Sequence, residues 1–158
     1  MIRCIIVGYG FLGKRLAREL AAGKIEGVKL VGIASSKGYI YRDEGLAYDN
    51  LPERIDQARD FKEAPATEMI SKEFADLLVE LTPTNIEDGE PGLSHIKQAL
   101  EEGMDVVTAN KGPIALAFEE LSSLADERGS LLLYEATVGG GLPLISLQRR
   151  CLMADELI

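Results

Sequence analysis

Residues 2–13, IRCIIVGYGFLG, join an almost wholly apolar run to a glycine-rich turn of the form Gly-x-Gly-x-x-Gly. The apolar run is typical of a parallel strand that is covered on both faces. After the turn, leucines recur every four residues as far as Leu20, which predicts an amphipathic helix ending near Gly23. Glycines in this setting permit a tight turn, close approach of a pyrophosphate, and packing of helix on strand, so the segment predicts a dinucleotide site. The residues expected around the phosphates are Gly8, Gly10, Phe11, Leu12 and Gly13.

The rest of the chain alternates apolar segments with helical periodicity. Strands are predicted over residues 28–34, 75–81, 105–108 and 130–135, and helices over 92–102, 114–128 and 143–152. Residues 35–66 are expected to form a long connection with one short helix over 52–61. This alternation predicts an α/β, Rossmann-type fold with a doubly wound, mostly parallel sheet. The length of 158 residues fits a single dinucleotide-binding domain over 1–158.

Composition and charge narrow the class of protein. A chain that is 46% hydrophobic and 27% charged has the composition of an ordinary soluble domain. The net charge of −9 argues against a nucleic-acid partner. Since neither a signal peptide nor an apolar run of about 20 residues is present, we expect a cytoplasmic protein with no membrane partner. Cys4 is expected to be a buried hydrophobe, and His95 is expected to have no catalytic role.

The end of the second predicted strand bears on which dinucleotide is bound. A cofactor without a 2′-phosphate usually meets an acidic residue about 20 residues after the glycine turn. The corresponding residues here are Ser35, Ser36 and Lys37, with no acid among them. Hydroxyls and a lysine suit a 2′-phosphate, which favours NADP over NAD. The alternative is that these residues form a solvated turn.

Two further segments follow predicted strands at the edge where doubly wound sheets bind ligands. Thr82 and Pro83 are expected to contact ribose or nicotinamide, or else simply to end the strand, because a residue before proline is held extended. Lys111 can hold a substrate carboxylate, contact the cofactor or polarise a carbonyl. The alternative is that Lys111 is a solvated loop lysine.

The strings LTPTN (81–85), TANKGP (108–113) and EATVGGGLP (135–143) together resemble the cofactor domain of homoserine dehydrogenase, over essentially the whole chain. The resemblance implies NAD(P)-linked interconversion of aspartate semialdehyde and homoserine, on the branch to threonine and methionine. It implies that Lys111 is the catalytic residue of this chain, on the nicotinamide and substrate side. It also implies a loop that binds a monovalent cation such as Na⁺, mostly through backbone carbonyls. The ligands implied are Glu135, Val138, Gly140 and Leu142.

Other functions and partners remain open from the sequence. Glu135 can instead order its loop through amide hydrogen bonds, with no ion. The family's enzymes carry their acid–base lysine and substrate-binding acids in a second part, so we expect a complementing substrate domain and a homo- or hetero-oligomer. The expected contact face is the terminal helix with Leu144, Leu147 and Leu152. The alternatives are a non-catalytic NAD(P)-binding regulatory module and the cofactor domain of another small-substrate dehydrogenase, such as aspartate dehydrogenase. Retention of Lys111 and of the Glu135 loop argues against the regulatory module.

Overall fold

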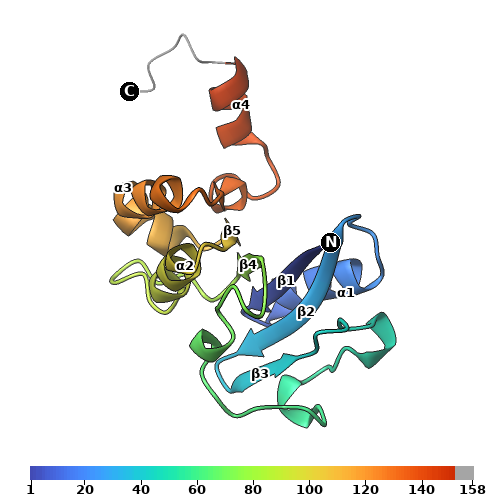
Figure 1. The fold of residues 1–158 in the computed structure, drawn as a ribbon. Coiled ribbons are helices and arrows are strands. Elements are labelled where there is room, and N and C mark those ends of the chain that lie inside the picture. The colour runs from blue at the N-terminus through green and yellow to red at the C-terminus, as the bar shows by residue number, and fades with distance from the viewer. Residues whose placement is uncertain (152–158) are drawn as a thin grey trace.

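The computed structural model describes residues 1–151 and contains one six-stranded sheet in the order β3-β2-β1-β4-β5-β6 (Figure 1). All neighbouring strands are parallel except β2 and β3, which are antiparallel. The strands are β1 (Ile2–Val7), β2 (Val28–Ser35), β3 (Gly38–Tyr41), β4 (Leu77–Glu80), β5 (Asp105–Thr108) and β6 (Leu132–Leu133). The helices are α1 (Phe11–Ala21), α2 (Gly92–Glu101), α3 (Lys111–Arg128) and α4 (Leu144–Cys151). The predicted doubly wound, mostly parallel Rossmann-type sheet is therefore confirmed.

The core lies on both faces of the sheet, as the apolar run of β1 predicts. Ile5 and Val7 belong to a cluster that α2 and α3 cover, whereas Cys4 and Ile6 belong to a second cluster under α1. All four side chains are almost completely buried. Because successive side chains of a strand point to opposite faces, burial of the whole run requires helices on both sides.

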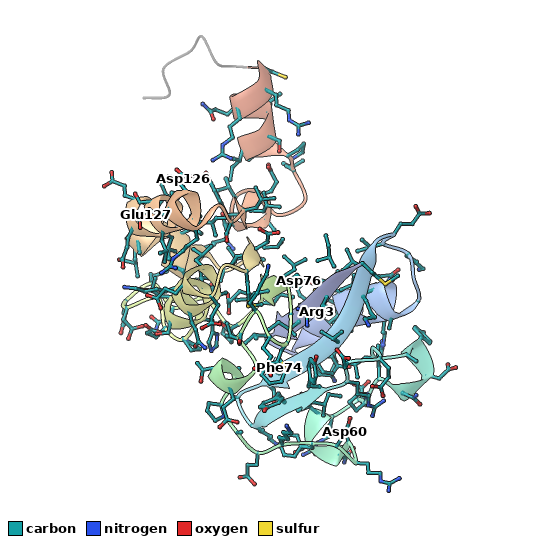
Figure 2. The ribbon with its side chains drawn as sticks, in the orientation of Figure 1. Arg3, Asp60, Phe74, Asp76, Asp126 and Glu127 are labelled. Carbon is teal, nitrogen blue, oxygen red and sulfur yellow. The ribbon has the colours of Figure 1, made fainter. Side chains whose placement is uncertain are left out.

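Arg3, the polar residue within β1, forms hydrogen bonds at the amino end of the strand, away from the glycine turn. Its backbone amide and its Nε both donate to the carboxylate of Asp76, over 2.9 and 3.3 Å. The amide of Asp76 donates in return to the carbonyl of Arg3, over 2.8 Å. Figure 2 shows the two side chains next to each other. The pair therefore ties the amino ends of β1 and β4 together.

The connection after β2 differs from the prediction in two ways. Residues 38–41 form the antiparallel strand β3, which the sequence analysis placed in an irregular connection. The helix predicted over 52–61 is wrong, because only a short 3₁₀ turn over Ile55–Gln57 is present. Apolar side chains of this segment, including Leu51, Ile55 and Phe61, pack onto the α1 side of the sheet from largely extended backbone.

Smaller differences affect the last elements. The helix predicted from residue 114 begins at Lys111, because the side chain of Asn110 caps it by accepting a hydrogen bond from the amide of Gly112. The strand predicted over 130–135 is reduced to Leu132–Leu133, and Glu135–Thr137 form a 3₁₀ turn. The terminal helix is present as α4, while Leu152 lies outside the described residues. No helix within residues 1–151 combines the length and the apolar character needed to cross a membrane.

Candidate functional site

The glycine turn lies at the carboxyl end of β1, beside the point where the strand order reverses. Gly8 has a φ of 108°, and a Cβ there would collide with the backbone of Leu81 and Thr82. A Cβ at Gly13 would collide with the carbonyl of Gly8, so α1 packs directly on the turn. Gly10 differs, because no atom lies within 4 Å of its Cβ position. Gly10 is therefore the point at which a ligand can approach the backbone closely.

The start of α1 is suited to an anion. Its N-cap is Gly10, no side chain caps it, and its first turn has no acidic residue. The amides of that turn and the helix dipole are thus directed at the open space above Gly10. Phe11 and Leu12 are the first two residues of α1, and they are 88% and 58% exposed. These features fit the pyrophosphate of a dinucleotide.

The turn after β2 contains a cluster of opposite charges. The ammonium of Lys37 lies 2.6 Å from Oδ2 of Asp56, and Nη2 of Arg54 lies 2.9 Å from the same oxygen. These two cations hold the pKa of Asp56 well below its usual range. Beside the cluster is a hollow of about 660 Å³, whose lining includes Ser36, Lys37, Asp56 and Phe61. The sequence analysis missed Arg54, which reaches the turn only because the connection folds back over β2 and β3.

Thr82 and Asn110 join the two loops that follow β4 and β5. The amide and hydroxyl of Thr82 both donate to Oε1 of Glu80, the last residue of β4. The side-chain amide of Asn110 donates to the hydroxyl of Thr82 over 3.2 Å. Asn110 directly precedes Lys111, whose side chain is exposed at the first position of α3. The predicted residues Thr82, Pro83 and Lys111 therefore lie at one edge of the sheet.

The sequence analysis missed Glu80, Thr108 and Asn110. Glu80 is completely buried, and Thr108 and Asn110 are 1% exposed. The available signal was a carboxyl group inside the otherwise apolar strand residues 77–81, since charged groups are rarely buried without partners. His95 is also buried, with its Nδ1 3.8 Å from Oε1 of Glu80. The expectation that His95 has no catalytic role stays a prediction.

Glu135 orders the loop after β6 through helix α4. Its carboxylate accepts hydrogen bonds from the amide of Ile145, over 2.9 Å, and from the amide and hydroxyl of Ser146, over 3.0 and 2.6 Å. The Ser146 hydroxyl and these amides lower the pKa of Glu135. The carboxylate therefore performs the role that the sequence analysis gave as the alternative to metal binding.

Binding of a cation by the same loop would depend on its free oxygen atoms. Besides the carboxylate, the carbonyls of Glu135 and Leu142 accept hydrogen bonds from the amides of Val138 and Leu144. Hard cations need several convergent oxygens. Two of the four implied ligands thus already accept a hydrogen bond at the carbonyl that an ion would need, and we derive no step through a cation.

Comparison with known proteins agrees with this geometry. A family model described as the NAD-binding domain of homoserine dehydrogenase matches residues 8–135. The homoserine dehydrogenase of Methanocaldococcus jannaschii is 34% identical over 167 residues, covering 98% of this chain and 50% of the relative. The NAD(+)-dependent homoserine dehydrogenase of Pseudomonas canavaninivorans is 34% identical over 147 residues, covering 93% of this chain and 37% of the relative.

A solved structure shows the same arrangement. A hyperthermophilic archaeal homoserine dehydrogenase in complex with NADPH superposes with a TM-score of 0.79 at 28% identity. The match covers 97% of this chain and 49% of that one. The chain thus spans half the length, or less, of these relatives.

Proposed function

Because this chain belongs to the family of homoserine dehydrogenase NAD-binding domains, we propose that it forms the cofactor-binding half of a homoserine dehydrogenase. The reaction interconverts aspartate semialdehyde and homoserine by hydride transfer with a nicotinamide cofactor. The observation that carries the proposal is the open space above Gly10. It lies at the uncapped start of α1 and on the same sheet edge as Lys111.

The strand order sets the orientation of the dinucleotide. Doubly wound sheets bind it in the crevice where the order reverses, which here is between β1 and β4. The adenosine half then lies over β2, beside Ser35, Ser36 and Lys37. The nicotinamide half lies over β4 and β5, beside Thr82, Pro83 and Lys111.

The charges after β2 favour NADP. Lys37 and Arg54 are both exposed and both pair with Asp56, and of these three residues Lys37 and Asp56 line the hollow. A 2′-phosphate placed there would accept charge-assisted hydrogen bonds from two cations. The chain has a net charge of −9, so an anionic cofactor must be held by such local groups.

Lys111 is the catalytic residue that we assign to this chain. It is exposed at the start of α3, where the positive end of the helix dipole adds to its charge. The bound dinucleotide supplies or accepts the hydride. Lys111 would donate a hydrogen bond to the aldehyde oxygen, or hold the substrate carboxylate, so that the reacting carbon faces the nicotinamide.

The second half of the site belongs to a complementing substrate domain. The edge strand β6 is paired on one side only, and α4 projects away from the sheet (Figure 1). Apolar side chains are exposed along this end of the molecule. They include Leu131, Leu133, Leu142, Leu144 and Leu147. We place the substrate domain against this surface, since exposed leucines at one end of a molecule are typical of an interaction site.

The proposed activity is tested by homoserine-dependent reduction of NADP⁺. The chain alone should bind NADPH without turnover, and adding the substrate domain of a relative such as the M. jannaschii enzyme should restore turnover. Binding of NADPH without activity in the reconstituted pair would favour the regulatory module instead. Turnover with aspartate but not with homoserine would favour aspartate dehydrogenase.

The phosphate site is tested by filling the space above Gly10. Gly10→Ala adds a methyl group that meets no protein atom, so the variant should fold normally. It should nevertheless weaken NADPH binding at least about tenfold, because the methyl group occupies the path of the pyrophosphate. Gly141→Ala is the matched control, since a Cβ there also meets no atom and the residue lies outside the turn. Equal affinities for the two variants would contradict the proposed phosphate site.

A further inference from the structure

A buried polar cluster lies directly under the nicotinamide side of the proposed site. Glu80 is the one completely buried carboxyl group within residues 1–151, and it is the last residue of the otherwise apolar strand β4. Helix α2 covers it closely, because a Cβ at Gly92 would lie 3.2 Å from Oε2 of Glu80. Burial of a carboxyl group is costly unless its oxygens are hydrogen-bonded. The partners of Glu80 therefore indicate what it does.

The direction of each hydrogen bond in the cluster follows from one fixed donor. The backbone amide of Gly112 can only donate, so the atom of Asn110 that faces it must be the amide oxygen. The nitrogen of the same side chain must then donate to the hydroxyl of Thr82. That hydroxyl has one proton, and it lies beside Oε1 of Glu80, which can accept it.

The proton of the Thr82 hydroxyl is therefore used inside the protein. One of its lone pairs is also used, by Asn110. The hydroxyl cannot donate a hydrogen bond to a ribose or to a nicotinamide carboxamide, which was one of the roles expected from the sequence. What Thr82 can present to a ligand is its backbone carbonyl and its methyl group.

The same chain of hydrogen bonds connects two loops. Thr82 follows β4 and Asn110 follows β5, and Asn110 is the N-cap of the helix that begins with Lys111. The two loops also touch through their backbones, since a Cβ at Gly112 would collide with the carbonyl of Asn85. Thr108 adds a further link, because its hydroxyl accepts from the amide of Asn110 over 3.0 Å and lies 3.3 Å from the carbonyl of Glu80.

We propose that Glu80 is a positioning residue that, through Thr82 and Asn110, fixes the nicotinamide side of the dinucleotide site and the start of the Lys111 helix. The inference rests on the proposed function, because it assumes that a nicotinamide lies over β4 and β5. Glu80 itself touches no ligand. It sets the Thr82 hydroxyl in one orientation and so sets the spacing of the two loops.

The test compares the affinities for two ligands that share the adenosine half of the cofactor. NADPH contacts both sides of the crevice, whereas adenosine 2′,5′-bisphosphate has the adenine, ribose and 2′-phosphate but no nicotinamide. Thr82→Val keeps the shape of the side chain and removes the hydroxyl. It should weaken NADPH binding by about tenfold, the effect of losing roughly one hydrogen bond, and leave the affinity for adenosine 2′,5′-bisphosphate unchanged. Thr82→Ser retains the hydroxyl and should restore NADPH binding.

A second variant tests the same hydrogen bonds independently, in case Thr82→Val does not fold. Asn110→Ser keeps a side-chain oxygen that can cap α3 but lacks the amide nitrogen that reaches Thr82. It should lower the affinity for NADPH selectively, as Thr82→Val does. Loss of both ligands in parallel, or of neither, in variants that melt cooperatively would overturn the inference. Failure of the unaltered chain to bind either ligand would instead overturn the proposed function.

Discussion

A single lysine in the turn after β2 should discriminate between the two dinucleotides if this turn binds the 2′-phosphate as proposed. Lys37→Ala removes one of the two cations that pair with Asp56, beside the proposed 2′-phosphate position. We expect the affinity for NADPH to fall by about 1–2 kcal/mol, the contribution of one charge-assisted hydrogen bond, and the affinity for NADH to change little. Fluorescence titrations of the same preparation with both cofactors measure the difference. Equal losses for NADPH and NADH would mean that the cluster is only a solvated turn.

The glycines of the turn could be recognised from the sequence because the backbone itself makes a demand at two of them. Gly8 and Gly13 are recognisable because any side chain there would strike the backbone, and the strand and helix around them repeat a known pattern. Arg54 and Glu80 carry no such local demand. Each reaches a distant residue only through a near neighbour, Arg54 reaching Lys37 through Asp56 and Glu80 reaching Asn110 through Thr82, and only the folded chain brings these together.

The link between β1 and β4 makes the sheet sensitive to acid. Arg3 lowers the pKa of Asp76 below its usual value of 3.8. A carboxyl group with a lowered folded-state pKa stabilises the protein above the unfolded value, and the contribution disappears as the pH falls through the folded value. Asp76→Asn should therefore cost up to about 1 kcal/mol near neutral pH and progressively less below about pH 4.

Urea unfolding at several pH values measures this effect. Asp126→Asn is the control, because Asp126 is exposed on α3 and has no ion pair within the described residues (Figure 2). The difference between Asp76→Asn and the unaltered protein should shrink in acid. A difference that stays constant with pH would show that Asp76 acts through shape and not through charge.

The contact between Glu135 and α4 determines whether that helix is anchored. Its carboxylate binds the amides of Ile145 and Ser146 at the first turn of α4, where a negative charge also complements the helix dipole. Glu135→Ala should expose these amides and raise their hydrogen-exchange rates about fivefold or more, as expected for a lost cap. Glu127→Ala on α3 should leave them unchanged. Unaltered exchange in Glu135→Ala would show that α4 is held by other contacts.

Element boundaries were predicted well for β1 and β5, too broadly for β4, which was predicted over 75–81 and spans Leu77–Glu80, and poorly for the two edge strands. β1 and β5 lie inside the sheet, and their predicted and observed bounds agree. β3 and β6 are the two edge strands, so each is paired with a neighbouring strand on one side only. Residues 38–41 combine glycine and tyrosines without a clear periodicity, and only pairing with β2 makes them a strand.

In the molecule as a whole, the amino ends and the carboxyl ends of the strands have different roles. At the amino ends of the strands the Arg3–Asp76 pair fixes β1 to β4. At the carboxyl ends the open space at Gly10, the Lys37 cluster and Lys111 lie along one line of strand ends. The Arg3–Asp76 pair thus lies at the opposite ends of the strands from the proposed ligand site, so substitutions of this pair should leave dinucleotide binding intact.

The apolar surface beside β6 allows the last prediction, on assembly. Leu131 and Leu133 are 59% and 48% exposed and lie two residues apart, so in an extended chain they share one face. If the substrate domain packs there, Leu131→Ser together with Leu133→Ser should weaken its binding by roughly 2–4 kcal/mol, from the apolar area no longer buried. Binding of NADPH by the chain alone should not change, because both residues lie away from the glycine turn. Ile86→Ser is the control, since Ile86 is 72% exposed but lies in the loop after β4. Sedimentation of the chain with the substrate domain measures the interaction, and unchanged binding in the double variant would place the partner elsewhere.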